Sequence, residues 1–442
     1  QTGFTAGNFS VNLNSFGIAS ANRTGTWTFT NPSGGTIRLS YAAATPDYIW
    51  SGASGNWSTG FTPTAPVTDK NLVFTGSGGT ATNDIASGTL SSINYITFNS
   101  TAGAYTLNAT TGAAGLAGGT ALTVKGDILN NSANAQTIAM NLAFGSSSTG
   151  IVETAAGNIT ISGNISGTGA LNKAGNSTLT LTGVNTYTGT TTINAGTLQV
   201  GNATTGSIAS SSIVNNGTLV INKNESMTLS SMTGTGNLTA DFSTGFLRLG
   251  GNITLNGTVT INNTKGQSGG QAGIRQSQNT TIRASAITLN GSLGSAGNDS
   301  NYVLTLDTSS TNGTINLDIY NGMGGHTWGA ASSVIANAGT GALNIVGSQA
   351  GKGGAWNANL TGALNIASTY TAGTLTLNAT AASSITGSVT LSSAAANVWT
   401  VSPGVTMTAS GVLAGSSAAI TKNGTGTLIL GGANTYTGAT TI

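Results

Sequence analysis

The sequence predicts an all-β protein whose chain winds into a β-solenoid, and three observations predict it. Short runs that alternate apolar and polar residues occur along most of the chain, Gly and Asn stand between them, and one long segment occurs twice. Alternation with a period of two turns one face of a strand inward and the other to water. Many short strands divided by turn residues are typical of stacked coils.

The composition indicates a folded chain with very few charges. Charged residues make up 5% of the 442 residues and hydrophobic residues 38%, whereas ordinary soluble domains carry about 25% charged residues. The 67 Gly and 5 Pro follow no period of three, which excludes a collagen-like chain, and the absence of Cys excludes disulfides. Stability must therefore come from packing and hydrogen bonds.

The charge balance and the lack of long apolar runs bear on partners. Nucleic-acid binding needs clustered positive charge, and 12 Lys+Arg stand against 10 Asp+Glu, so we expect no nucleic-acid partner. No stretch approaches the ~18 apolar residues of a membrane span, so we expect none in this chain. No basic and apolar leader precedes Gln1, which fits a mature N-terminus left after signal removal.

The spacing of the alternating runs predicts the size of a coil. Run centres at residues 344, 365, 376 and 390 favour two or three strands in a coil of about 20 to 25 residues. Asn-Gly pairs such as 216–217 and 256–257 suit the corners, because both residue types accept a positive φ. On the outer face we expect Thr and Asn to stack on their own kind in the next coil, in ladders where like charges would repel.

The internal repeat is the strongest signal. Residues 173–193, KAGNSTLTLTGVNTYTGTTTI, align without a gap with residues 422–442, KNGTGTLILGGANTYTGATTI, at an offset of 249, and 14 of the 21 positions are identical. Low complexity alone would not preserve the NTYTG block at 185–189 and 434–438.

With its flanks, this repeat resembles a known family. The segments 167–173 and 179–183, the NTYTG block and 193–200 look like the autotransporter-associated β-strand repeat, also called the passenger-associated transport repeat. The resemblance implies a single-stranded right-handed parallel β-helix that is secreted and lies outside the cell, on a bacterial surface or in its matrix.

The domain organisation follows from these patterns. We expect an N-terminal β segment at 1–49, as a smaller cap or a region that joins subunits, and a β-solenoid at 50–442. The family repeats are expected at 167–202 and at 415–442, the second copy being incomplete.

The two ends suggest head-to-tail assembly with other copies of the chain. Ile442 corresponds to Ile193, so the second copy lacks the counterpart of 194–200 and leaves an open strand edge, while residues 4–11 follow the pattern of the missing piece. Strand addition at such an edge builds a filament. The alternative is that both segments share only a common coil pattern, which 372–377 also shows. The interface expected under the assembly hypothesis comprises Phe4, Ala6, Gly7, Phe9, Val11, Leu428, Leu430, Tyr436 and Ile442.

No catalytic constellation emerges, and we expect no enzyme, cofactor or metal site. His326 is the single histidine and lies in a Gly-rich stretch without nucleophile-elbow spacing. Asp307 and Asp318 are the best pair for cleaving a glycan, but outer-face solvation or turn capping explains them as well. No calcium-loop pattern is present.

Four basic residues and one tryptophan form a candidate glycan contact. A stretch between Asp241 and Asp299 holds no other acid, so its basic residues offer a grip for an anionic polysaccharide, and an exposed indole stacks on sugars. The bland alternatives are solvated loop charges and a ring packed under a loop. The residues are Arg248, Lys265, Arg275, Arg283 and Trp328.

Together these patterns predict a structural protein of the cell exterior. The first expectation is a β-solenoid subunit of a surface fibre or stalk, which polymerises through residues 4–11. The alternative is an adhesin passenger that binds a polysaccharide or a cell surface.

Overall fold

The computed structural model describes residues 26–30, 38–42, 48–145, 150–209, 212–242, 245–263, 273–295, 302–321, 333–345, 356–366, 370–391 and 396–442. The chain divides into two compact units. Unit 1 comprises Gln1–Gly163 with Ala174–Thr178, and unit 2 comprises Asn164–Lys173 with Leu179–Ile442.

The elements before residue 164 are short strands and one helical turn. They are β1 (Thr26–Thr30), β2 (Arg38–Ala42), β3 (Tyr48–Trp50), β4 (Gly55–Asn56), α1 (Trp57–Gly60), β5 (Phe61–Thr62), β6 (Lys70–Phe74), β7 (Gly79–Asn83), β8 (Ser92–Phe98), β9 (Tyr105–Ala109), β10 (Leu122–Val124), β11 (Ile128–Asn130), β12 (Gln136–Ile138), β13 (Leu142–Phe144), β14 (Ile151–Thr154) and β15 (Ile159–Ile161).

Unit 1 begins with antiparallel pairs and continues as parallel coils. β1 pairs antiparallel with β2, and β3 pairs antiparallel with β5 but parallel with β6. From β6 onward the named strands of this unit pair in parallel, as between β7 and β9 and between β12 and β15. The predicted boundary at residues 49 and 50 lies within β3.

Aromatic rings fill the first coils of unit 1. Trp50 and Trp57 are almost fully buried, and both rings lie against Phe61, at centroid distances of 5.3 and 5.7 Å. Phe74 stacks on Phe98 of the next coil at 5.2 Å. Among the described strands, β3 and β6 form the first parallel pair, so the large rings together with α1 and β5 cap the core at this end.

The elements from residue 164 on are mostly short strands, with longer strands between Ala286 and Ala379. They are β16 (Ile165–Gly167), β17 (Leu171–Ala174), β18 (Thr178–Leu181), β19 (Thr191–Ile193), β20 (Thr197–Val200), β21 (Ile213–Asn215), β22 (Thr218–Asn222), β23 (Met227–Leu229), β24 (Met232–Gly234), β25 (Asn237–Phe242), β26 (Leu247–Leu249), β27 (Ile253–Leu255), β28 (Thr258–Asn263), β29 (Ile274–Gln276), β30 (Thr280–Arg283), β31 (Ala286–Ser295), β32 (Val303–Asp307), β33 (Ile315–Asn321), β34 (Ser333–Ile345), β35 (Trp356–Ile366), β36 (Tyr370–Ala379), β37 (Ser383–Ile385), β38 (Val389–Leu391), β39 (Ala396–Val401), β40 (Thr406–Ala409), β41 (Leu413–Ala414), β42 (Ala419–Asn423), β43 (Thr427–Leu430) and β44 (Thr440–Thr441).

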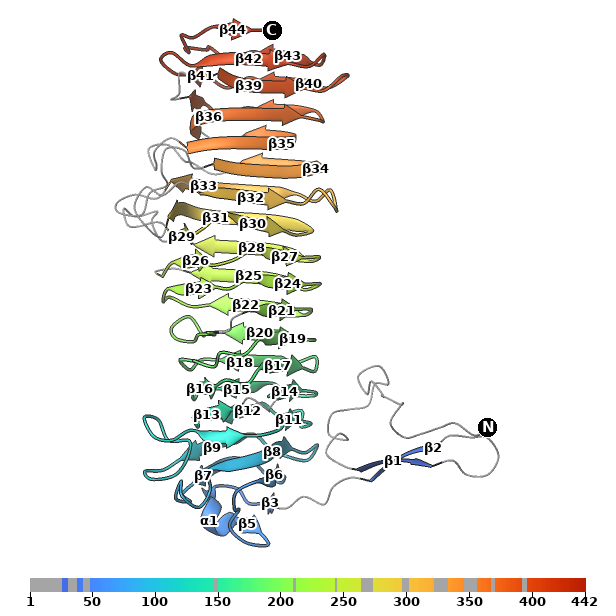
Figure 1. The fold of residues 1–442 in the computed structure, drawn as a ribbon, viewed down its shortest axis with the longest axis vertical. Helices are drawn as coiled ribbons and strands as arrows, with labels where there is room; N and C mark the ends of the chain where they lie inside the picture. The colour runs from blue at the N-terminus through green and yellow to red at the C-terminus, as the bar shows by residue number, and fades with distance from the viewer. Residues whose placement is uncertain are drawn as a thin grey trace. The chain divides into compact units, whose positions relative to one another are not determined.

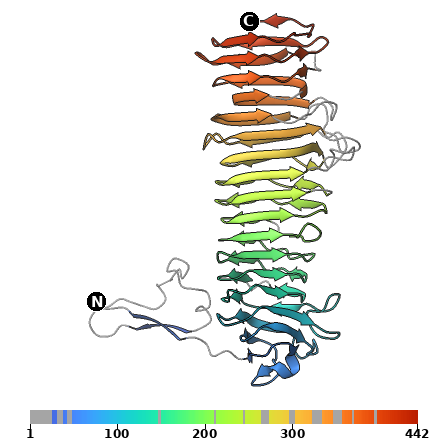
Figure 2. The ribbon, with the colours of Figure 1, turned by 180° about the vertical axis from the view of Figure 1, so that it is seen from behind.

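The strands of unit 2 stack one above another, as both views show (Figures 1 and 2), and their pairings form three parallel columns. Column 1 runs from β17 through β19 and β30 to β44. Column 2 runs from β20 through β28 and β33 to β43. Column 3 contains β23, β26, β29 and the second half of β31, and later β38 and β41.

The length of a coil varies along the stack. Leu219 aligns with Leu238, whereas Val259 aligns with Ile287, so the second of these two coils contains the longer stretch of chain. The insertions fall at the corners, because the strands themselves must keep the register that holds apolar residues inside. Leu238, Val259 and Ile287 are fully buried one above another.

The outer face carries the expected hydrogen-bonded ladder in column 2. The Asn344 side-chain amide donates to Asn316 Oδ1 at 2.8 Å, and the Asn365 amide donates to Asn344 Oδ1 at 3.0 Å. Ser384 Oγ continues the ladder by donating to Asn365 Oδ1 at 3.0 Å. An amide has both a donor and an acceptor, so each Asn bonds the coil on either side.

The prediction of fold class is therefore confirmed. The described chain is an all-β parallel β-solenoid that matches a right-handed parallel β-helix. Among the described residues, no helix is long and apolar enough to cross a membrane.

Candidate functional site

The NTYTG block of the first repeat copy forms a corner whose tyrosine lies in the core. Tyr187 is fully buried, and its Oη lies 2.7 Å from Thr191 Oγ1. Burial raises the pKa of the Tyr187 hydroxyl well above its ordinary value, so the group stays neutral at physiological pH. A neutral hydroxyl bonded inside the core is suited to structure rather than to proton transfer.

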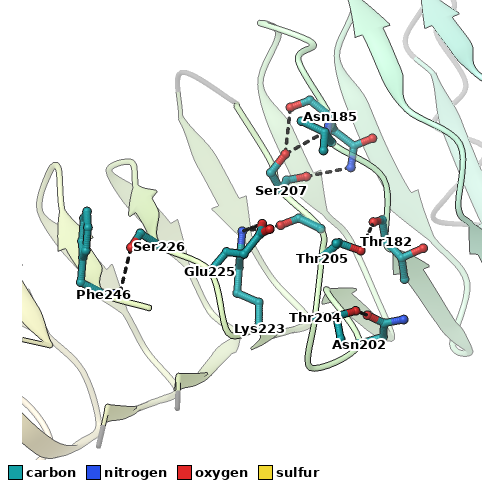
Figure 3. Close-up of polar contacts among 12 residues, drawn as sticks. Thr182, Asn185, Asn202, Thr204, Thr205, Ser207, Lys223, Glu225, Ser226 and Phe246 are labelled. Carbon is teal, nitrogen blue, oxygen red and sulfur yellow. Dashed lines mark hydrogen bonds and ion pairs between the residues drawn. The ribbon is translucent and has the colours of Figure 1, made fainter. Parts of the chain in front are cut away.

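Asn185 joins the coils on both sides of this corner. Its Oδ1 accepts the backbone N–H of Ile165 at 2.8 Å in the preceding coil. Towards the following coil, its Nδ2 donates to Ser207 O at 2.7 Å and its backbone N–H donates to Ser207 Oγ at 2.9 Å (Figure 3). One side chain thus satisfies polar groups of two neighbouring coils that would otherwise be buried without partners.

Gly189 and Lys173 complete the corner. A Cβ on Gly189 would lie 2.3 Å from the backbone oxygen of Gly169, so the two coils approach too closely for any side chain. Lys173 is fully buried, and its Nζ donates to Ala195 O in the following coil at 3.0 Å. The residues that define the repeat therefore bond one coil to the next.

The second copy repeats this geometry towards its preceding coil. Asn434 Oδ1 accepts the Leu413 N–H at 2.9 Å, and Tyr436 Oη lies 2.6 Å from Thr440 Oγ1. A Cβ on Gly438 would lie 2.3 Å from Ala418 O, the same close approach as at Gly189.

The predicted interface residues of this copy are partly exposed. Leu428, Leu430 and Tyr436 are only half-buried, and Ile442 is 94% exposed. Their counterparts in the first copy are buried because a further coil covers them. The N-terminal members of the predicted interface, Phe4, Ala6, Gly7, Phe9 and Val11, lie outside the described residues.

A buried lysine lies at the corner between columns 2 and 3, in the coil after the first copy (Figure 3). Lys223 Nζ donates to Gly206 O at 2.6 Å and lies 3.7 Å from Glu225 Oε2. Burial lowers the pKa of Lys223, and the nearby Glu225 carboxylate opposes that shift. This cation is neutralised locally and fixes the loop at 201–206.

In the next two coils, column 3 carries two arginines in register. Arg248 in β26 aligns with Arg275 in β29, and both lie over the ring of Phe246, at 5.7 and 3.6 Å from its centroid. Arg275 is 3% exposed, and burial together with the Arg248 charge lowers its pKa. Arg248 Nε is buried and has no hydrogen-bond partner in the described part of the chain.

The structure brings together only part of the predicted glycan contact. Arg283 lies in column 1, where its Nε donates to Asp307 Oδ2 at 2.8 Å, so it is neutralised and separate from the arginine pair. Lys265 and Trp328 lie outside the described residues. Sequence reasoning missed Phe246, although the alternation of 246–249 places it on the same outer face as Arg248.

The residues considered for catalysis do not form a site in the described chain. Asp307 in column 1 aligns with Arg283, whereas Asp318 in column 2 aligns with Asn290. His326 lies outside the described residues. Among those that are described, no three His, Asp or Glu side chains are grouped as metal ligands.

Comparisons with known proteins identify the repeat. A family model described as Passenger-associated-transport-repeat matches residues 171–200 and 420–442, the two segments whose corners are described above. No curated protein and no solved structure matches the chain. The chain is a parallel β-solenoid that carries two passenger-associated transport repeats.

Proposed function

We propose that the chain is a non-catalytic stalk segment of a passenger-like protein that bacteria carry on their surface or release into the surrounding matrix. The observation that carries this proposal is the use of the repeat residues. Asn185 and Gly189 make contacts between coils, and the buried Tyr187 hydroxyl bonds Thr191 within its own corner, so the side chains of the repeat are used for packing. The repeat family supports a location at the cell surface.

The outer face supports a structural role as well. The side-chain amides of Asn316, Asn344 and Asn365 hydrogen-bond one another between coils. Such ladders stabilise a stack at every coil, and they need neither disulfides nor cofactors. This suits a chain without Cys that works outside the cell.

Export is the direct test of this function. The chain is fused to an export signal and an outer-membrane translocator in a Gram-negative host, and intact cells are treated with protease. We expect the solenoid at the cell surface, resistant to mild proteolysis, whereas the Gly189→Val variant is degraded. Retention of the folded chain inside the cell contradicts the proposal, as does release of reducing ends from polysaccharides incubated with the purified chain.

Head-to-tail assembly belongs to the same proposal. The half-buried Leu428, Leu430 and Tyr436 need a further coil, which either the same polypeptide or a second copy can supply. If a second copy supplies it, the purified chain forms fibres visible by electron microscopy, and deletion of residues 1–12 abolishes them. Fibres that persist unchanged after the deletion would exclude residues 4–11 as the joining strand.

Glycan binding is the second candidate function, and the arginine pair favours it. Arg248 and Arg275 hold adjacent positive charges in a chain that is otherwise poor in charge, and Arg248 is partly exposed while Arg275 is buried. A glycan array probed with the purified chain separates the candidates, because a pure stalk gives no specific signal.

A further inference from the structure

We infer that Arg248, with the positive charge of the buried Arg275 beside it, binds the carboxylate groups of an acidic polysaccharide. This inference rests on the second candidate function and deepens it by assigning the site and the chemistry of the ligand. Its evidence is the register of the two arginines, their shared aromatic ring and the state of the Arg248 guanidinium.

The pair is an exception to the charge pattern of the described strands. Where neighbouring coils align, outer positions carry mostly hydroxyls and amides, and Arg283 meets an opposite charge in Asp307. Arg248 and Arg275 are the one pair of like charges in register within the described strands. Adjacent strands lie about 4.8 Å apart, so the two cations repel each other.

Burial increases the cost of this repulsion. Arg275 is almost fully buried, and Arg248 Nε has lost its water without gaining a partner in the described chain. The Phe246 ring offsets only part of this cost through its negative face. Arg248 belongs to none of the ion pairs of the described residues, which join Lys125 to Asp69, Lys223 to Glu225 and Arg283 to Asp307. An anion bound to the Arg248 guanidinium offsets this repulsion and offers an acceptor to Nε.

The chemistry of the site favours carboxylate on a glycan. A guanidinium presents its N–H donors as a planar fork that matches a carboxylate, and the partly exposed Arg248 offers such a fork while the buried Arg275 adds positive charge beside it. Arg248 and Phe246 remain partly exposed, so a ligand reaches them from solvent. Thr228, one coil before Arg248 in the same column, is exposed and offers a hydroxyl to sugar hydroxyls.

Nucleic acid fits this surface poorly. Phosphate backbones are bound by many cations spread over an extended face, and the whole chain has a net charge of +2. One accessible guanidinium suits single carboxylates better than a continuous phosphate chain.

The test measures binding of oligogalacturonate to the purified full chain by calorimetry, at low salt and then at increasing salt. We expect specific binding that weakens with salt, no binding of the methyl-esterified oligomer, and a loss of about 10-fold or more in affinity for Arg248→Gln. Arg248→Lys keeps the charge without the fork and should bind with intermediate affinity. The matched control is Arg283→Gln, which removes the same charge in column 1 and should change affinity by less than about twofold.

Thermal unfolding provides a readout that a structural role would not share. Without ligand, Arg248→Gln should leave the melting temperature unchanged or raise it, because it removes a charge that repels Arg275. A lower melting temperature with unchanged binding would make Arg248 a structural residue and overturn the inference.

The remaining outcomes distinguish the assigned site from glycan binding in general. Equal losses for Arg248→Gln and Arg283→Gln, or binding to glycans that does not depend on Arg248, overturns the assigned site but leaves glycan binding standing. Binding of inorganic phosphate or dextran sulfate in preference to oligogalacturonate overturns the carboxylate assignment. No binding to any glycan overturns both the inference and the second candidate function.

Discussion

The two copies of the repeat have nearly the same sequence and the same bonds to the coil before them, yet they differ in burial. In each copy the tyrosine hydroxyl, of Tyr187 or Tyr436, bonds the threonine four residues further along the chain. In each copy the asparagine side chain also accepts a backbone N–H from the preceding coil. The first copy also bonds the coil that follows it, through Asn185 and Ser207. Tyr187 is buried, whereas Tyr436 is half-exposed.

This difference shows which contacts of a coil the repeat sequence determines by itself. The NTYTG corner carries its own contacts with the preceding coil, so these appear wherever the motif occurs. The contacts on the other side depend on the partner that the next coil provides, as Ser207 does for Asn185. Stability in stacked repeats is approximately a sum over such neighbour interfaces, so the two copies should respond differently to the same substitution.

The largest expected effect comes from filling the close approach at the corner glycine. Gly189→Val and Gly438→Val place the new atoms 2.3 Å from a backbone oxygen of the preceding coil in both copies. The first copy is held from both sides and must distort, at a cost of about 3 kcal/mol or more. In a sample of residues 1–442 to which no further coil is added, the second copy is held from one side only, so we expect roughly half that loss.

Hydrogen exchange measured by mass spectrometry resolves these two losses coil by coil. Peptides that cover 165–170 and 413–419 report the preceding coil in each case. Equal losses of protection in the two copies would mean that the following coil adds no constraint, which would contradict the expected difference between the copies.

The asparagine of the corner should give the next largest difference. Asn185→Ala leaves the Ile165 N–H and the Ser207 carbonyl without their partners, and we expect a loss of about 2 to 4 kcal/mol in local unfolding free energy. Asn434→Ala affects the Leu413 N–H, and we expect about 1 kcal/mol. Exchange of these amide protons is the measurement, and a larger loss in the second copy would contradict the model.

The tyrosine hydroxyl should show the same trend at a smaller scale. Tyr187→Phe removes a buried bond to Thr191, and we expect a loss of about 1 kcal/mol. Tyr436→Phe should cost only a few tenths of that, because its exposed hydroxyl exchanges one partner for water. Urea unfolding followed by circular dichroism of both variants measures the difference, and equal destabilisation would show that burial of the first copy is unimportant.

The sequence predicts the fold well because the fold depends on local patterns. Alternating runs such as 364–366 and 375–377 specify inside and outside, and they lie in β35 and β36 as expected. The length of each coil is harder to predict from the sequence. Insertions at the corners lengthen some coils, as between Val259 and Ile287, without changing the alternating pattern of the strands.

The candidate site was only partly predictable for a related reason. Which outer residues meet depends on register, and register follows from the number of residues in each corner. The basic stretch did point to Arg248 and Arg275, which align. It also pointed to Arg283, but this residue lies in a different column and forms an ion pair with Asp307. No spacing in the sequence reveals that arrangement.

Acid sensitivity should give the smallest effect and should spare both repeat copies. Residues 171–200 and 420–442 contain no Asp or Glu, so their difference in stability should not change with pH. In β32, burial alone would raise the pKa of the Asp307 carboxyl, but the hydroxyl and N–H of Ser309 and the guanidinium of Arg283 outweigh it, and the pKa is lowered.

The sign of the effect follows from proton binding. Because the unfolded carboxyl binds protons at a higher pH than the folded one, the stabilisation is present above its ordinary pKa of 3.8 and is lost as the pH falls through the lower folded value. Arg283 is 53% exposed, so we expect less than about 1 kcal/mol. Hydrogen exchange between pH 5 and pH 2, corrected for intrinsic rates, should show lost protection at 280–283 and 303–307, and Asp307→Asn should abolish the pH dependence. An equal loss in 171–200 would mean that charges elsewhere act on the repeat, and the neutral corner would no longer explain its stability.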